Sequence, residues 1–229
     1  MPFSLTPARV ATDELLDEHD AAEDDMTRSL RDLRRFNSLA GGRRAYLAML
    51  SRLIPKRDAR PVVLDLGTGT SDLLDAVKRR WPRTTSIGLD MNIRHLNYGR
   101  RLGGAPIARC AGNAFHLPFR DGSVDIVTSS HFFHHFSPDE NREIVRESLR
   151  VAGVGLAFTD TRRHYAPLLF VRLVGALRLV GPITRFDAPA SVLQGYTMTE
   201  MRDFARSLRV RSAEVFTLVP FRFGLVVRR

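Results

Sequence analysis

An α/β fold with a mostly parallel sheet is predicted by three features of the chain. Residues 62–66 form a short apolar run that leads directly into a turn containing Gly67 and Gly69. A helix is expected from about residue 71 to Trp81, where Pro82 ends it. Further strand-like segments follow, and each is followed by polar residues. This pattern is typical of an open parallel sheet, which binds ligands at the carboxyl ends of its strands.

The turn after the first strand favours a nucleotide-like cofactor. Gly67 and Gly69 allow the backbone to turn sharply beside a ligand. Dinucleotide sites place a third small residue near a pyrophosphate, whereas this chain has Asp72, whose charge would repel phosphates. S-adenosylmethionine carries no phosphate and therefore fits better. A glycine turn with a purely structural role is the alternative.

The next two strands are expected to add polar residues at the same edge. Residues 85–90 end in Asp90, near the spacing of the acid that binds ribose hydroxyls, although this residue could instead cap the helix after Met91. Residues 106–114 contain Asn113, whose amide can both donate to and accept from an adenine edge.

The remaining strands complete the predicted sheet. The fourth, residues 122–130, runs into the sequence HFFHHF at positions 131–136. The fifth is expected at 155–159, and residues 210–217 and 224–227 form a closing antiparallel hairpin.

Helical segments lie before and within the predicted core. Near-helical apolar spacing predicts helices over 28–37 and 45–53, and we interpret residues 1–59 as an N-terminal helical lid, with helices that merely cover the sheet as the alternative. Residues 60–229 form the core, with a cap insertion at about 162–196.

The cap contains an apolar stretch, residues 166–180, interrupted by Arg172 and Arg178. It is too short and too charged to predict a membrane span. We favour a cap wall lining a lipophilic pocket over a buried helix or an interfacial helix. A further inserted loop or helix starts at 187–191, and a capping box opens a helix over 197–208.

Composition narrows the class of protein. The 229 residues are 44% hydrophobic, enough for one buried core, and the single cysteine, Cys110, excludes an intrachain disulfide framework. The first residues lack a secretory apolar stretch, so a cytoplasmic protein is expected. The net charge of +10 comes from arginines spread along the chain without a basic run, so no nucleic-acid partner is expected.

The segments LDLGTGTSD, GLDMN and GNAFHLPFRDGSVDIVTSSHFFHHF resemble class I S-adenosylmethionine-dependent methyltransferases, of the small-molecule branch that includes the ubiquinone and menaquinone methyltransferases. The resemblance covers about residues 60–161. It implies a Rossmann-like fold, with a mostly parallel seven-stranded sheet and an antiparallel C-terminal strand, and S-adenosyl-L-methionine as the cofactor. It does not specify the acceptor.

The resemblance also implies the cofactor residues. The methionine end would be lined by Asp65, Gly67 and Gly69, while Asp90 would bind the ribose and Asn113 with Ala114 would meet the adenine. The full predicted set is Asp65, Gly67, Thr68, Gly69, Asp90, Met91, Asn113, Ala114 and Ser130. The chain departs from the usual pattern at Ser71, where many relatives have glycine, and at Asn113, where aspartate is commoner.

Short motifs after the fifth strand, DTRRHYAPLL, DAPASV and TMTEM, also resemble methyltransferases that accompany bacterial type III polyketide synthases. This second resemblance implies secondary metabolism and a phenolic or pyrone acceptor. We therefore expect O-methylation of a phenolic or polyketide-like compound, with C-methylation of a quinone-like ring or a noncatalytic S-adenosylmethionine-binding protein as alternatives. Transient membrane contact and a homodimer remain open.

Histidines after the fourth and fifth strands are the catalytic candidates. Methyl transfer requires alignment of the nucleophile, exclusion of water and, for a phenol, weakening of its proton. Histidine suits this last step because its pKa lies near neutrality. The candidates are His131, His134 and His164, with His135 as a further histidine of the cluster. No metal is expected, since HxxHH shows no further ligand, and no GxSxG hydrolase motif occurs.

Overall fold

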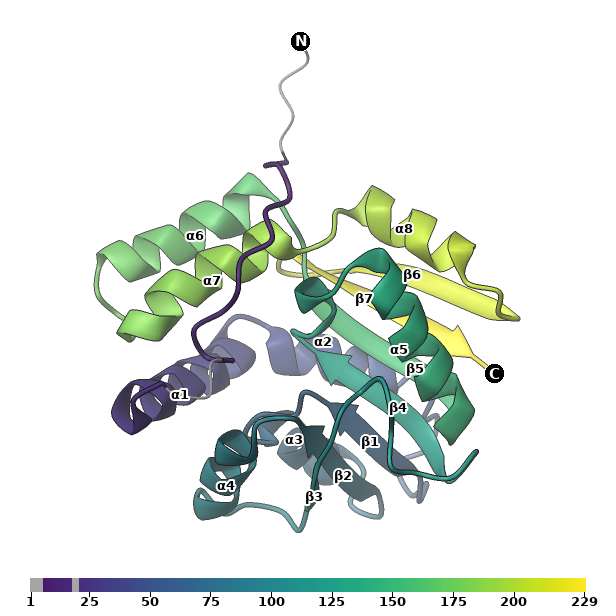
Figure 1. Cartoon of the computed structure of the whole chain (residues 1–229). Helices are drawn as coiled ribbons and strands as arrows, with labels where there is room; N and C mark the ends of the chain where they lie inside the picture. Colours follow the sequence, from purple (N-terminus) through teal and green to yellow (C-terminus); the bar gives the residue numbers. More distant parts are fainter. Residues whose placement is uncertain (1–5, 18–20) are drawn as a thin grey trace.

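The computed structural model describes residues 6–17 and 21–229, and its centre is a seven-stranded sheet in the order β3-β2-β1-β4-β5-β7-β6 (Figure 1). The strands are β1 (Val62–Leu66), β2 (Thr85–Asp90), β3 (Ala108–Ala111), β4 (Val124–Ser130), β5 (Ala152–Thr161), β6 (Ser212–Leu218) and β7 (Arg222–Arg228). The strands from β3 to β5 pair in parallel, and β7 runs antiparallel to both β5 and β6. The predicted Rossmann-like sheet is confirmed.

Helices cover both faces of the sheet and form a separate cap beside its carboxyl edge (Figure 1). They are α1 (Glu23–Leu39), α2 (Gly42–Leu50), α3 (Asp72–Arg80), α4 (Ile93–Arg101), the 3-10 helix η1 (Phe133–His135), α5 (Pro138–Val151), α6 (Tyr165–Ala176), α7 (Pro182–Gln194) and α8 (Met198–Ser207). Apolar residues of α5 and α8 pack into one core cluster with the sheet, and those of α2 and α3 into another. The sheet is therefore buried on both faces, as parallel sheets require.

Several element boundaries differ from those predicted. Strand β5 extends over Ala152–Thr161 because β4 pairs with it as far as Thr159 and β7 pairs with it as far as Thr161, so Asp160 belongs to the strand. Residues 187–191 do not begin an element, since α7 already begins at Pro182. Helix α1 likewise begins at Glu23, before the expected position.

The N-terminal helices take two different positions. In α2, Tyr46 and Met49 are completely buried against the sheet. Helix α1 instead packs on α7, where Asp32 Oδ2 accepts hydrogen bonds from Gly181 N at 2.7 Å and from Thr184 Oγ1 at 3.2 Å. Part of the predicted lid is therefore sheet cover, and the division of the chain at residue 59 stays a prediction.

The cap consists of the paired helices α6 and α7. A parallel bridge between Arg162 and Tyr196 joins the two ends of this insertion at its base. Across residues 6–17 and 21–229, no helix has the length and apolarity needed to cross a membrane.

Phe158→Ala should reduce the free energy of unfolding by about 3–5 kcal/mol, because the ring is buried in central strand β5 and its centroid lies 4.7 Å from that of Phe133. Val154→Ala, at a half-exposed position of the same strand, should change it by no more than about 0.5 kcal/mol. Urea unfolding followed by circular dichroism measures both. Equal losses would contradict the assigned core.

Candidate active site

A cavity of about 470 Å³ lies at the carboxyl edge of the sheet, where the cofactor was predicted. Its lining includes six of the predicted cofactor residues: Gly67, Gly69, Asp90, Met91, Asn113 and Ala114. Asp65, Thr68 and Ser130 do not line it and are buried. Helix α1 contributes Leu30 and Leu33 to the wall.

Asp90 is held in place by the backbone around it. Its Oδ2 accepts a hydrogen bond from Gly69 N at 2.7 Å, and its Oδ1 accepts one from Asn92 N at 2.9 Å. Burial raises the pKa of Asp90, although the neighbouring His95 and these two hydrogen bonds oppose the rise. Gly69 has a φ of +52° and no atom near the position of an added Cβ, so the turn leaves open space beside the carboxylate.

Asn113 presents a defined hydrogen-bonding group to the same cavity. Its Oδ1 accepts a hydrogen bond from Phe115 N at 2.9 Å. The amide NH₂ is consequently the group of Asn113 that remains to donate to a ligand, for example to a ring nitrogen of adenine.

Asp65 and Gly67 are fixed in place by contacts around the glycine turn. Tyr46 donates a hydrogen bond to Asp65 Oδ1 at 2.8 Å, and burial raises the pKa of Asp65 to about 7. Gly67 has a φ of +61°, and a Cβ there would lie only 2.6 Å from Phe132 Cδ2. Glycine is therefore required at this position both by conformation and by space.

A second cavity, of about 520 Å³, lies between α1, the cap helices and the β6–β7 turn. Its walls are predominantly apolar and include Phe36, Phe170, Val171, Val174, Val192 and Phe221. Three residues, Leu33, His131 and Ser191, line both cavities. The two cavities therefore meet beside His131, an arrangement suited to bringing two small molecules together.

His131 is a neutral residue held by a buried arginine. Its Nε2 lies 2.6 Å from Arg222 Nη1. A guanidinium can only donate, so Nε2 accepts and the ring proton is on Nδ1. Burial, followed by the charge of Arg222, lowers the pKa of His131 to about 3.

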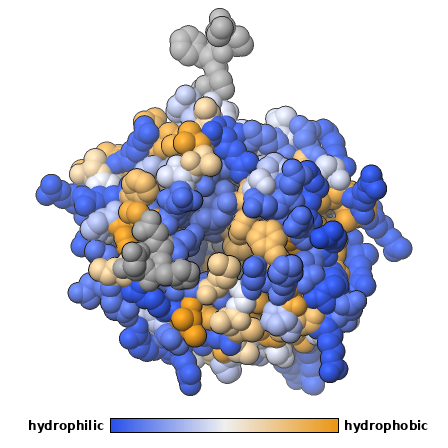
Figure 2. All heavy atoms as spheres, viewed as in Figure 1, coloured by the Kyte–Doolittle hydropathy of each residue, from blue (hydrophilic) through white to orange (hydrophobic). Residues whose placement is uncertain are grey.

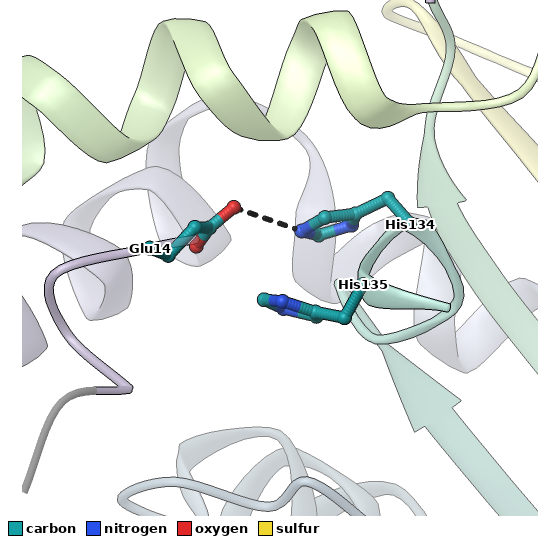
Figure 3. A group of neighbouring side chains, drawn as sticks. All are labelled: Glu14, His134 and His135. Carbon is teal, nitrogen blue, oxygen red and sulfur yellow. Dashed lines mark ion pairs between the residues drawn. The ribbon is translucent and has the colours of Figure 1, made fainter. Parts of the chain in front are cut away.

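His134 lies between two carboxylates. Its Nδ1 is 2.9 Å from Asp160 Oδ1, and its Nε2 is 3.2 Å from Glu14 Oε1 (Figure 3). Burial disfavours the cation, but the charge of Asp160, the hydrogen bond to it and the nearby Glu14 carboxylate outweigh burial and raise the pKa of His134 to about 10. The pKa of Asp160 is correspondingly held below its usual range. At neutral pH His134 is thus an imidazolium ion.

His135 and His164 have different surroundings. The His135 ring stacks on that of His134 with centroids 4.2 Å apart (Figure 3), and its Nδ1 lies 3.3 Å from Asp17 Oδ2. His164 caps α6, where its Nδ1 accepts a hydrogen bond from Ala166 N, and it lines neither cavity. The structure brings His131 and His134 together but leaves His164 apart, and a catalytic role for each stays a prediction.

Three charged residues of the site did not emerge from the sequence as site residues. Glu14 lies in an acidic N-terminal stretch, and Arg222 follows a loop between two C-terminal strands. Neither position carries a motif. Asp160 could have been identified, because it directly follows the predicted fifth strand, at the edge where polar residues gather.

Two overlapping groups have ligand atoms within 4.8 Å of one another, as metal sites do: His131 with His134 and Asp160, and Glu14 with His134 and His135. Both groups use His134, each of whose ring nitrogens already faces a carboxylate. A metal ion that bound His134 would have to displace a proton from one of its ring nitrogens. This donor set is better explained as an ion-paired imidazolium, and the expectation of no metal stays a prediction.

Comparison with known proteins gives a consistent result. Residues 63–155 match the family described as "Methyltransferase domain". A demethylmenaquinone methyltransferase from Thermotoga maritima is 38% identical over 90 residues, 39% of this chain and 38% of the relative. A malonyl-[acyl-carrier protein] O-methyltransferase from Xylella fastidiosa is 38% identical over 71 residues, 30% of this chain and 24% of the relative. The matches thus span less than two fifths of either curated relative.

The fold has solved counterparts across almost the whole chain. A plantazolicin methyltransferase crystallised with S-adenosylhomocysteine (SAH) superposes with a TM-score of 0.68 at 10% identity, covering 94% of each chain. Residues 63–155 thus match a methyltransferase domain, and the whole chain has the fold of solved S-adenosylmethionine-dependent methyltransferases. The methyltransferase domain implies S-adenosylmethionine as the cofactor, and solved counterparts are crystallised with S-adenosylmethionine or SAH.

Asp90→Ala and Gly67→Val should each weaken S-adenosylmethionine binding by about tenfold or more, the first by removing the carboxylate and the second by forcing Phe132 into the cavity. Isothermal titration calorimetry measures the dissociation constants. Asp139→Ala, at an exposed carboxylate on α5, is the control and should bind normally. Unchanged affinity in both site variants would refute the assignment.

The His134 ion pairs should make stability depend on pH. The pKa of His134 is raised to about 10 in the folded protein, compared with about 6.5 in the unfolded chain. Its protonation therefore stabilises the fold fully below pH 6.5, and this stabilisation is lost as the pH rises toward 10. The wild type should therefore lose more unfolding free energy between pH 7 and 10 than His134→Gln does. Urea titrations at each pH test this difference, with His116→Gln, an exposed histidine, expected to follow the wild type. Parallel curves for wild type and His134→Gln would contradict the ion-paired state.

Proposed function

We propose that this protein transfers a methyl group from S-adenosylmethionine to an oxygen of a phenolic or polyketide-like acceptor bound in the apolar cavity. When bound, the cofactor supplies an electrophilic methyl group on a sulfonium. The apolar walls would hold the hydrophobic part of the acceptor and exclude water. The junction of the two cavities at His131 supports placing the acceptor oxygen there.

The observation that carries this proposal is the buried guanidinium of Arg222. Arg222 is only 5% exposed, yet it lines the apolar cavity. Burial lowers the pKa of Arg222 to about 10, so it remains charged at neutral pH. The charge of Asp160 partly offsets this effect of burial, but among the described residues no carboxylate forms an ion pair with Arg222. A buried cation of this kind favours an acceptor that carries or develops negative charge.

The same group suggests how the acceptor is activated. The positive charge of Arg222 would lower the pKa of a phenolic hydroxyl bound beside it, making the oxygen a better nucleophile. Nδ1–H of His131, which lies 3.9 Å from Asp160 Oδ1, offers a second donor at the junction, since Nε2 is engaged with Arg222. With a pKa of about 3, His131 serves in this proposal as a hydrogen-bonding group that positions the oxygen, and not as the proton acceptor.

C-methylation of a quinone-like ring is the second candidate. It is favoured by the similarity to the demethylmenaquinone methyltransferase. Arg222 would serve this reaction too, because an ionised ring hydroxyl enriches the neighbouring ring carbons in electrons. Incubation with labelled S-adenosylmethionine and a panel of alkylphenols, pyrones and hydroquinones, followed by NMR of the product, distinguishes the two. No methylated product from any of these, despite cofactor binding, would favour the noncatalytic alternative.

Arg222→Gln should lower kcat/KM for a phenolic acceptor by about 100-fold and shift the rising limb of its pH profile to higher pH, because the phenolate loses its buried counter-charge. Its affinity for S-adenosylmethionine should be unchanged. Arg35→Gln is the control, since Arg35 lines the same cavity with a side chain that is 69% exposed. Methyl-transfer kinetics from pH 6 to 9 test the prediction, and an unshifted profile would exclude this role for Arg222.

A further inference from the structure

Helix α6 has Arg172 as its single charged residue, is otherwise strongly apolar, and is mostly uncovered. Of its twelve residues only Pro167 and Leu168 are buried. Leu169 is 63% exposed, Phe170 49% and Leu173 59%. Helices that are apolar all round are ordinarily buried in a core or in a membrane. The exposure of α6 therefore indicates a surface that meets another apolar phase.

The helix has two apolar faces with different roles. Leu169 and Leu173 lie four residues apart and share the outward face. Val171 and Val174, on the opposite side, line the acceptor cavity. We call the outward-facing set, together with the turn that follows the helix, the α6 face. It consists of Leu169, Phe170, Leu173, Leu177 and Leu179.

The rim of the acceptor cavity is continuous with the α6 face. Phe170 and Leu179 belong to the face and also line the cavity. Two further lining residues from other elements are exposed, Leu39 at 86% and Phe221 at 39%. The exposed lining of the cavity is consequently mostly apolar, with Arg35 as an exposed charged residue among it.

The charged residues in the chain segment that carries the α6 face have one sign. Between positions 161 and 186 the chain contains five arginines and no acidic residue. Arg172, Arg178 and Arg185 are exposed. In Figure 2, apolar groups lie among hydrophilic ones in the upper left, where Figure 1 places α6 and α7. Exposed leucine and phenylalanine interspersed with arginine match the interfacial region of an anionic bilayer.

We propose that the α6 face docks on the surface of an anionic lipid bilayer, with the exposed leucines among the acyl chains and the arginines at the headgroups. Docking would bring the rim of the acceptor cavity against the bilayer, so that a lipophilic acceptor enters without crossing water; this uptake step rests on the proposed function. A second copy of the chain fits the face less well, because two such faces would bring like charges together.

Vesicle sedimentation tests the docking with the full-length protein. The wild type should bind vesicles of phosphatidylglycerol and phosphatidylcholine, and bind pure phosphatidylcholine more weakly. Leu169→Glu/Leu173→Glu should weaken binding by about tenfold or more. Leu102→Glu, at an exposed leucine after α4, is the matched control and should bind normally. Arg172→Glu/Arg178→Glu should remove the preference for phosphatidylglycerol and most of the salt dependence.

Failure to bind phosphatidylglycerol vesicles, or equal binding by Leu169→Glu/Leu173→Glu and Leu102→Glu, would overturn the proposal. A dimer detected by light scattering would also overturn it, if the protein does not bind vesicles and Leu169→Glu/Leu173→Glu dissociates the dimer. In that case a second copy of the chain would cover the α6 face. Calorimetry with S-adenosylmethionine should give wild-type affinity for all variants. Vesicle binding is read without methyl transfer, so its failure is distinguishable from failure of the proposed reaction.

Discussion

The arrangement of the site depends on one buried cation, the His134 imidazolium between Asp160 and Glu14. Burying an ion is costly unless opposite charges and hydrogen bonds compensate it. Here the compensation comes from strand β5 on one side and from the N-terminal segment on the other. Glu14 also accepts a hydrogen bond from Ser191 of α7, at 2.6 Å. A single charge cluster therefore joins the sheet, the cap and the N-terminal segment around the cofactor cavity.

A neighbouring contact strengthens this connection. Asp187 of α7 accepts hydrogen bonds from the backbone nitrogens of Leu15 and Leu16. The segment around Glu14 is thus hydrogen-bonded to α7 through both a side chain and backbone nitrogens. It also forms part of the wall of the cofactor cavity. The apolar cavity on the other side of His131 depends on the same placement, because the cap helices supply part of its walls.

The histidine cluster shows how tertiary surroundings separate chemically identical side chains. His131 faces a guanidinium and is neutral, whereas His134, three positions on, faces two carboxylates and is charged. The sequence identified both as candidates, since the fourth strand delivers them to the ligand-binding edge. Their protonation states could not be predicted, because Glu14 and Arg222 come from opposite ends of the chain. His164, which seemed equivalent by its position after a strand, became the cap of α6.

The sequence by itself determined the parallel sheet, the glycine turn and the presence of Asp90 and Asn113 at its edge. These features depend on local patterns of apolar residues and glycines, which act over a few neighbouring positions. Only the tertiary structure decided the length of β5, the apolar cavity under the cap and the electrostatics of the histidines. The reason is physical: the Arg222–His131 contact joins residues 91 positions apart, and charge compensation between such distant groups exists only once the chain has folded.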